Sequence, residues 1–227
     1  MCGRFALHTD TKTLLKQFPV AHCDELPLSY NVAPTENALC LINNETQINS
    51  IQMRWGFIPW YLRTSTTGKK PQLLINARAE TILEKPAFKQ AVQYRRCVLI
   101  ISGFFEWQQL EGTKEKQPYF IEKRHHELLA IAAIWQRIQQ PKQDSLPSFC
   151  LLTTKAANPT VAALHDRMPW MLSAFQTEDW LRDEQLSATH LKELLDHDEP
   201  IDLIAYPVTQ AVNSAKYKEK DSIKPQD

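Results

Sequence analysis

Cys97-Val98-Leu99-Ile100-Ile101-Ser102-Gly103-Phe104-Phe105-Glu106-Trp107 is the stretch that most constrains the fold. Its first half is apolar without interruption, which predicts a buried strand. Glu106 then stands alone among large apolar and aromatic neighbours. Such a carboxylate either points outward from an alternating strand or lies in a desolvated pocket, where its pKa rises towards neutrality. The second arrangement suits acid-base catalysis, and the residues alone leave both open.

Strand patterns continue on both sides of this stretch. The runs 38–42 and 47–55 flank Asn43-Asn44-Glu45-Thr46, which indicates a β-hairpin. A charged hairpin at 109–117 follows the central stretch. We expect further strands at 2–8, 119–122, 128–135, 148–154 and 203–208, and short helices from Asp10 to Phe18, over 86–94 and from Pro159. The acidic segment 177–199 predicts two helices on the solvated exterior.

Length and composition indicate one domain with a substantial core, because 43% of the 227 residues are hydrophobic. We expect this domain to cover residues 1–213 and a charged, flexible tail to follow at 214–227. No apolar run approaches the ~18–20 residues of a membrane span, and no signal-peptide core is present. We therefore expect a cytoplasmic protein that is not bound to a membrane.

The sequence predicts neither a metal site nor a cofactor. Its cysteines, at 2, 23, 40, 97 and 150, are odd in number and form no Cys-x-x-Cys pair. This pattern argues against a disulfide framework and a structural zinc site. Phosphate-binding loops and dinucleotide fingerprints are also absent from the sequence.

Charge is unevenly distributed along the chain. Residues 1–100 hold 12 Lys and Arg against 7 Asp and Glu, whereas residues 101–227 hold 14 against 19, which gives the overall 26 and 26. The balance excludes a protein that coats DNA by bulk charge. It allows a local basic groove in the first part of the chain.

The N-terminus carries a reactive possibility in Met1-Cys2-Gly3-Arg4. Removal of Met1, expected before a small residue, leaves a cysteine whose α-amine and thiol form a 1,2-aminothiol. The two groups titrate near pH ~7.7–8.0 and ~8.5, so both nucleophiles are partly available at neutral pH. Such a pair condenses with aldehydes. The alternative is that position 2 merely carries a small residue.

Three other segments combine groups that suit chemistry or nucleic-acid binding. Trp60 and Tyr61 adjoin a polar stretch with Arg63, Lys69 and Lys70, a combination that grips single strands, although aromatic loops also pad cores. Asn76, Arg78 and Glu80 alternate and would share one face of an extended segment, either at a site or on a solvated edge. His165 precedes an acid, an arginine and a proline on constrained backbone, and needs a partner to be catalytic.

Six motifs together resemble the SOS-response-associated peptidase family, the abasic-site processing proteins. They occur in order between residues 1 and 169: Met-Cys-Gly-Arg-Phe at 1–5, Tyr-Asn-Val-Ala-Pro-Thr at 30–35, Trp-Gly-Phe-Ile-Pro-Trp at 55–60, Ile-Asn-Ala-Arg-Ala-Glu-Thr at 75–81, Gly-Phe-Phe-Glu-Trp at 103–107 and His-Asp-Arg-Met-Pro at 165–169. The resemblance implies a single compact, strand-rich α+β domain, with mixed sheets forming a barrel-like core flanked by short helices.

The resemblance also implies a function and a set of site residues. The protein would be a monomer that binds abasic single-stranded DNA near duplex junctions and stays joined to it through a thiazolidine on Cys2. Asn76, Glu106 and His165 would complete the catalytic set. DNA would be contacted by Gly3, Arg4, Trp60, Tyr61, Arg78 and Arg167, whereas a basic position found in some members is Pro86 here.

Two other functions are compatible with the same residues. A thiol hydrolase would use Cys2 as nucleophile and His165 as base, and it would turn over without regard to abasic DNA. A non-covalent single-strand DNA-binding module would not need Cys2, and its binding would fall steeply with salt. A non-covalent DNA-binding module would not need the catalytic set of Asn76, Glu106 and His165.

Overall fold

The computed structural model describes residues 2–23, 26–44, 47–59, 73–137, 147–182, 184–197 and 199–226. Strands dominate this part of the chain and form two sheets, whereas the helices are short. The predicted strand-rich α+β fold is confirmed. Among the described residues, no helix is both long enough and apolar enough to span a membrane.

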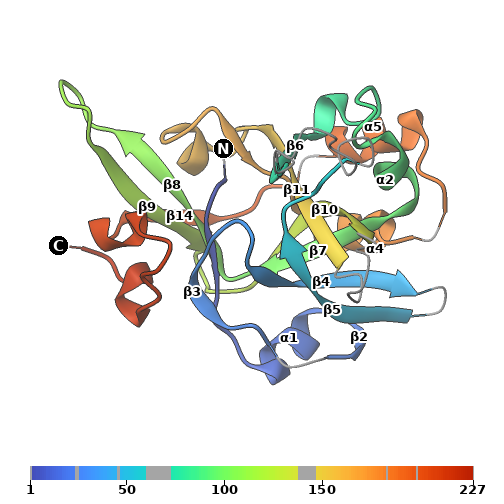
Figure 1. The fold of residues 1–227 in the computed structure, drawn as a ribbon, viewed down its shortest axis with the longest axis horizontal. Coiled ribbons are helices and arrows are strands. Elements are labelled where there is room, and N and C mark those ends of the chain that lie inside the picture. Colours follow the sequence, from blue (N-terminus) through green and yellow to red (C-terminus); the bar gives the residue numbers. More distant parts are fainter. Residues whose placement is uncertain are drawn as a thin grey trace, which may run out of the picture.

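Five strands of the larger sheet close into a ring. They are β4 (Asn37–Asn44), β5 (Gln47–Trp55), β7 (Arg96–Ile101), β10 (Leu129–Arg137) and β11 (Pro147–Lys155). Antiparallel pairing runs from β5 through β4, β7 and β10 to β11. A parallel pairing between β11 and β5 completes the ring, which confirms the predicted barrel-like core (Figure 1).

Strand β7 of the ring is buried on both faces. Cys97, Leu99 and Ile101 belong to one core cluster, together with alternate residues of the other four strands. Val98 and Ile100 belong to a second cluster on the opposite face. That face is covered by α1 (Thr11–Gln17), α2 (Lys89–Tyr94), α4 (Ala174–Trp180) and α5 (Ala188–Asp196). Burial on both sides explains why the stretch is apolar without alternation.

The prediction that residues 177–199 are a solvated exterior is wrong for one face of these two helices. Trp180 is fully buried, and its indole Nε1 donates to the Cys97 carbonyl at 2.9 Å. Leu191 and Leu194 of α5 join the same core cluster. The acidic residues of the segment hide this apolar face when composition alone is considered.

The smaller sheet places the N-terminus beside the central stretch. Its strand order is β14 (Leu203–Pro207), β9 (Lys116–Lys123), β8 (Gly103–Gln109), β1 (Phe5–Leu7) and β3 (Ser29–Val32). Only Ser102 separates β7 from β8, so the chain passes directly from the ring into this sheet. Ser102 also holds His8, because its Oγ accepts from the His8 N–H at 2.9 Å.

Shorter elements complete the fold. β2 (Val20–His22), β6 (Asn76–Arg78), β12 (Arg167–Pro169) and β13 (Met171–Leu172) add to the larger sheet. The remaining helix is α3 (Pro159–Ala162), and the 3-10 turns are η2 (Ala79–Thr81), η3 (Gln210–Asn213) and η4 (Lys220–Ile223).

The C-terminal segment packs against the smaller sheet, so the prediction of a flexible tail is wrong for residues 214–226. Asn31 Nδ2 donates to the carbonyls of Ser214 and Tyr217 at 3.2 and 2.8 Å. Ser222 is fully buried, and the segment lies next to β9 in Figure 1. Charged composition suggested disorder, but backbone groups rather than side chains provide much of the docking.

Gly103 is required for the sheet to close around Phe120. A Cβ at this position would lie 2.5 Å from Phe120 Cζ and 2.6 Å from the Ile121 carbonyl oxygen. We expect Gly103→Ala to lower the free energy of unfolding by about 3 kcal/mol, measured by urea denaturation. Gly112→Asn is the control, because Gly112 has φ 71° in open space and asparagine tolerates this backbone. Equal stability of the two variants would contradict the prediction.

Candidate active site

The pairing of β1 with β8 brings Cys2 alongside Glu106. Phe5 pairs with Phe104, and the Phe105 N–H donates to the Arg4 carbonyl at 3.0 Å. β1 begins at Phe5, so residues 2–4 lead into the strand, and Cys2 is near enough to Glu106 for the carboxylate charge to act on its thiol. Cys2 is 1% exposed. Cys2 therefore lies inside the protein, in the core cluster that also holds Phe5 and Phe104.

Asn76 holds Cys2 from the barrel side. Its Nδ2 donates to the Cys2 carbonyl at 2.8 Å, while its Oδ1 is buried and has no hydrogen-bond partner within the described structure. β6 carries Asn76 and pairs in parallel with β11 at Leu151. The strand is also held at residue 75, because Trp55 Nε1 donates to that carbonyl at 2.9 Å. Asn76 is thus a rigidly mounted amide with one oxygen still available to a substrate or an amine.

Glu106 lies in the desolvated setting, which decides between the two alternatives left open by its sequence. It is 2% exposed. Burial raises its pKa to about 7, and the nearby charge of Asp166 adds to this effect. A carboxyl group with this pKa can accept or donate a proton at neutral pH.

The Cys2 thiol has a raised pKa. Burial is the main cause, and the negative charge of Glu106 is the second. Cys2 Sγ lies 3.7 Å from the Arg4 carbonyl, towards which it can donate. The residue is therefore a protonated thiol at neutral pH, and the nearby Glu106 carboxylate disfavours its ionisation.

His165 and Glu106 both interact with Asp166. Its Nδ1 accepts from the Arg167 N–H at 2.9 Å and lies 2.8 Å from Asp166 Oδ1. The two contacts favour opposite protonation states, since the first needs a lone pair and the second a proton. Burial lowers the pKa of His165, which favours the neutral ring with its proton on Nε2. Asp166 acts electrostatically on both His165 and Glu106.

The three predicted DNA-contacting arginines differ in their surroundings. Arg167 is bound to Glu80 by two bonds of 2.7 and 2.9 Å and also donates to the Thr153 carbonyl. Arg4 Nη1 donates to Asn31 Oδ1 and to the Val212 carbonyl. Arg78 is exposed. Among these three arginines, Arg78 is therefore the one whose side chain is exposed to solvent. Arg4 and Arg167 instead form hydrogen bonds within the protein.

The prediction that Asn76, Arg78 and Glu80 share one extended face is wrong at Glu80. β6 ends at Arg78, and Glu80 lies in the 3-10 turn η2. From there its carboxylate reaches Arg167 and the Lys155 N–H. The sequence pattern missed this ion pair because the two residues lie 87 positions apart.

The remaining predicted residues contribute less to the described geometry. Gly3 is partly buried between Cys2 and Arg4. Trp60 and Tyr61 lie outside the described residues. Among the described residues, no group of three or more histidines, cysteines or acids is arranged to hold a metal.

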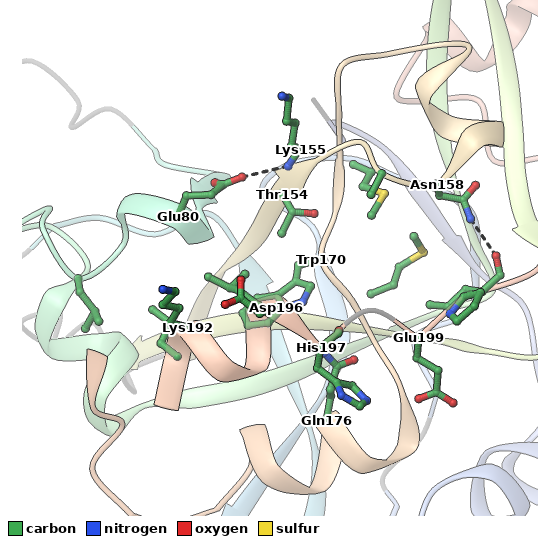
Figure 2. A pocket seen from close by; sticks show the side chains of 18 of the residues that line it. Glu80, Thr154, Lys155, Asn158, Trp170, Gln176, Lys192, Asp196, His197 and Glu199 are labelled. Carbon is green, nitrogen blue, oxygen red and sulfur yellow. Dashed lines mark hydrogen bonds between the residues drawn. The ribbon is translucent and has the colours of Figure 1, made fainter. Parts of the chain in front are cut away.

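A cavity of about 810 Å³ lies outside this cluster. Glu80, Trp170, Gln176 and His197 line it, whereas Cys2, Asn76, Glu106 and His165 do not (Figure 2). Figure 2 shows Thr154 and Lys155, from the end of β11, and Lys192 and Asp196, from α5, among the residues around it. The candidate active site is therefore separate from this cavity.

The raised pKa of Glu106 makes stability depend on pH. The folded-state pKa of about 7 exceeds the ordinary value of 4.5. The contribution of protonated Glu106 to the free energy of unfolding is therefore fully present below pH 4.5. It is lost as the pH rises through 7, and the loss amounts to as much as about 3 kcal/mol. We expect Glu106→Gln to remove this loss and to be more stable than the wild type at pH 8. Urea denaturation at pH 5 and pH 8 tests this, and equal pH dependence in both proteins would contradict it.

Comparison with known proteins supports the family resemblance that the six sequence motifs indicate. The family model "SOS response associated peptidase (SRAP)" matches residues 1–215. Abasic site processing protein YoqW of Bacillus subtilis is 34% identical over 219 residues, which cover 95% of this chain and 96% of that protein. Abasic site processing protein YedK of Escherichia coli is 31% identical over 234 residues, covering 99% and 100%. A solved structure from Bacteroides thetaiotaomicron has the same fold, with a TM-score of 0.78 at 20% identity and 99% and 98% coverage.

Proposed function

The chain belongs to the SOS response associated peptidase family, and we propose that it captures abasic sites in single-stranded DNA covalently through Cys2. Relatives at 31–34% identity are named abasic site processing proteins. The observation that carries the proposal is the position of Cys2, held by Asn76 at 2.8 Å and beside a buried Glu106 with a pKa of about 7. The proposal requires that Met1 is removed, so that residue 2 has a free α-amine.

The reaction joins one aminothiol to one aldehyde and releases one water. The Cys2 α-amine attacks C1′ of the ring-opened deoxyribose, and loss of water gives an imine. The thiol then adds to the same carbon, its proton passes to the nitrogen, and a five-membered thiazolidine closes. In this proposal Glu106 moves protons in both steps, and Asn76 orients the amine through its Oδ1, which has no hydrogen-bond partner among the described residues.

Ring closure accounts for the use of a cysteine. An imine withdraws electrons from the sugar and promotes β-elimination, which breaks the strand. The thiazolidine has no C=N bond, so it leaves the strand intact. We propose that His165 assists imine formation or its reversal from the neighbouring segment, where its neutral ring carries a proton on Nε2.

We propose that DNA approaches the site past Gly3, which is partly buried, and Arg78, which is exposed. A glycine at position 3 lets a backbone come near the N-terminus, and Arg78 offers an exposed positive charge. Arg4 and Arg167 would contribute indirectly through the bonds described above, and Trp60 and Tyr61 would stack on bases. Single-stranded DNA near a duplex junction is the proposed substrate, because an aldehyde inside a stacked duplex is poorly accessible.

The thiol hydrolase is less well supported. Such an enzyme needs a thiolate, and a lowered pKa normally provides it. Here burial and Glu106 raise the pKa of Cys2. In addition, His165 Nδ1 is bonded to the Arg167 N–H, which leaves only Nε2 to act. Thiazolidine formation has no need for a preformed thiolate.

The test is incubation of the purified protein, with Met1 removed, with an oligonucleotide that contains one abasic site. We expect a stoichiometric adduct that survives heating on a denaturing gel and whose mass equals protein plus DNA minus one water. An intact duplex and an oligonucleotide without the abasic site are controls. Absence of the adduct with the single strand would overturn the proposal.

A further inference from the structure

The turn η3 and the residues after it contact both strands of the candidate active site. Arg4 Nη1, two residues after Cys2, donates to the Val212 carbonyl at 2.9 Å. Trp107 Nε1, one residue after Glu106, donates to Asn213 Oδ1 at 2.7 Å. Two successive residues of one turn thus bind the neighbours of the nucleophile and of the acid-base group.

Asn31 joins the same segment to Arg4 a second time. It is fully buried, and its Oδ1 accepts from Arg4 Nη1 at 2.8 Å. Its Nδ2 faces three carbonyls, those of Val212, Ser214 and Tyr217, at 3.3, 3.2 and 2.8 Å. One amide therefore fixes the N-terminal strand and the C-terminal segment with opposite ends.

Lys218 is a further contact between the C-terminal segment and the residues around Asn31. Its Nζ donates to the Asn31 backbone carbonyl and pairs with both carboxylate oxygens of Glu36. Glu36 in turn accepts from the Ala33 N–H at 2.9 Å. This lysine therefore connects the C-terminal segment to β3, which carries Asn31, and to Glu36 beyond it.

We propose that residues 212–218 and Asn31 form a clasp that positions Cys2 against Asn76 and Glu106 before DNA binds. Asn31, Arg4 and Lys218 are then positioning residues. Arg4 acts mainly inside the protein, because its Nη1 is bonded to two internal acceptors and its Nε is buried. The catalytic consequence rests on the proposed function, whereas the placement of the N-terminal strand does not.

Positioning makes a different prediction from DNA contact. A misplaced nucleophile slows the covalent step, and a displacement of about 1 Å can cost on the order of 100-fold. A lost phosphate contact instead weakens binding and lowers its salt dependence. We expect Asn31→Ala to reduce the adduct-forming rate at saturating DNA by roughly 10- to 100-fold and to leave the dissociation constant unchanged.

Asn31→Asp tests the Asn31 Oδ1 contact separately from the Nδ2 contacts. The carboxylate can still accept from Arg4, but it cannot donate to the three carbonyls. If the clasp positions Cys2, the adduct-forming rate of this variant also falls. Amide hydrogen exchange then rises over both residues 2–8 and residues 212–218, while β10 stays protected. Unchanged rate and exchange would overturn the proposal.

Lys218→Ala provides a variant at a partly exposed position that does not threaten folding. We expect faster exchange over 212–218 and a slower covalent step. Lys216→Ala is its matched control, because it removes the same charge from an exposed site in the same segment. Equal behaviour of the two, or an effect confined to DNA affinity, would overturn the proposal.

The two proposals can fail separately. If the wild type forms no adduct, the proposed function fails, but the exchange measurements still test the clasp. If the wild type forms the adduct and the Asn31 and Lys218 variants match it in rate and exchange, the clasp alone fails.

Discussion

A chain in which serine replaces Cys2 is expected to lose nearly all heat-stable adduct with abasic single-stranded DNA. Its α-amine can still condense with the aldehyde, but the hydroxyl closes the ring far less favourably than the thiol. The imine therefore persists, and it either hydrolyses or breaks the strand by β-elimination. We expect stable adduct to fall by on the order of 100-fold or more, with a borohydride-reducible species and cleaved DNA in its place.

Cys23→Ser is the matched control, because Cys23 is a partly buried thiol that packs against the core cluster on the helix-covered face of the ring. A second control keeps Met1, or any residue, joined to Cys2, which converts the α-amine to an amide. That chain should form neither the adduct nor the reducible imine. A heat-stable adduct from Cys2→Ser would show that another nucleophile reacts.

The fold could be predicted from local patterns where burial leaves a mark on sequence. β7 is apolar on both faces because it lies between the ring interior and the helices, and its sequence shows this directly. The closure of the ring leaves no such mark. It depends on two parallel pairs between β5 and β11, at Arg54 with Ser148 and Trp55 with Phe149, which are distant in sequence.

The candidate site was predictable as a set of residues and not as a geometry. The sequence left Glu106 with two alternatives, because its exposure depends on how β1 and β8 pack together. Glu80 and Asn31 show the same limit. Each is bonded to an arginine in a distant segment, so neither partner can be found from spacing.

The C-terminal segment shows a different reason for failure. Residues 214–227 are polar and charged, and composition predicts disorder for such a stretch. Its carbonyls at 214 and 217 are nevertheless bound by the buried amide of Asn31. Composition describes side chains, whereas this segment is docked largely by its backbone.

Glu106→Gln is expected to slow adduct formation by roughly 10²- to 10⁴-fold, the usual contribution of a positioned general acid or base. The amide keeps the shape of the side chain and its place in β8, but it can neither take a proton from the attacking amine nor give one to the leaving water. Since the pKa of Glu106 is about 7, the wild-type pH-rate profile should contain a step near this value. The profile of Glu106→Gln should lack that step.

Glu122→Gln is the appropriate control for loss of a buried carboxylate. Glu122 is 3% exposed on the neighbouring strand β9, where it is bonded to Tyr206 and His126 and not to Cys2. Its substitution should leave the adduct-forming rate and the pH profile close to those of the wild type, even if stability falls. Equal slowing by both substitutions would mean that Glu106 acts through the integrity of the sheet. A slow Glu106→Gln with a normal Glu122→Gln would place the proton transfer at Glu106, beside the residue that must become the N-terminus.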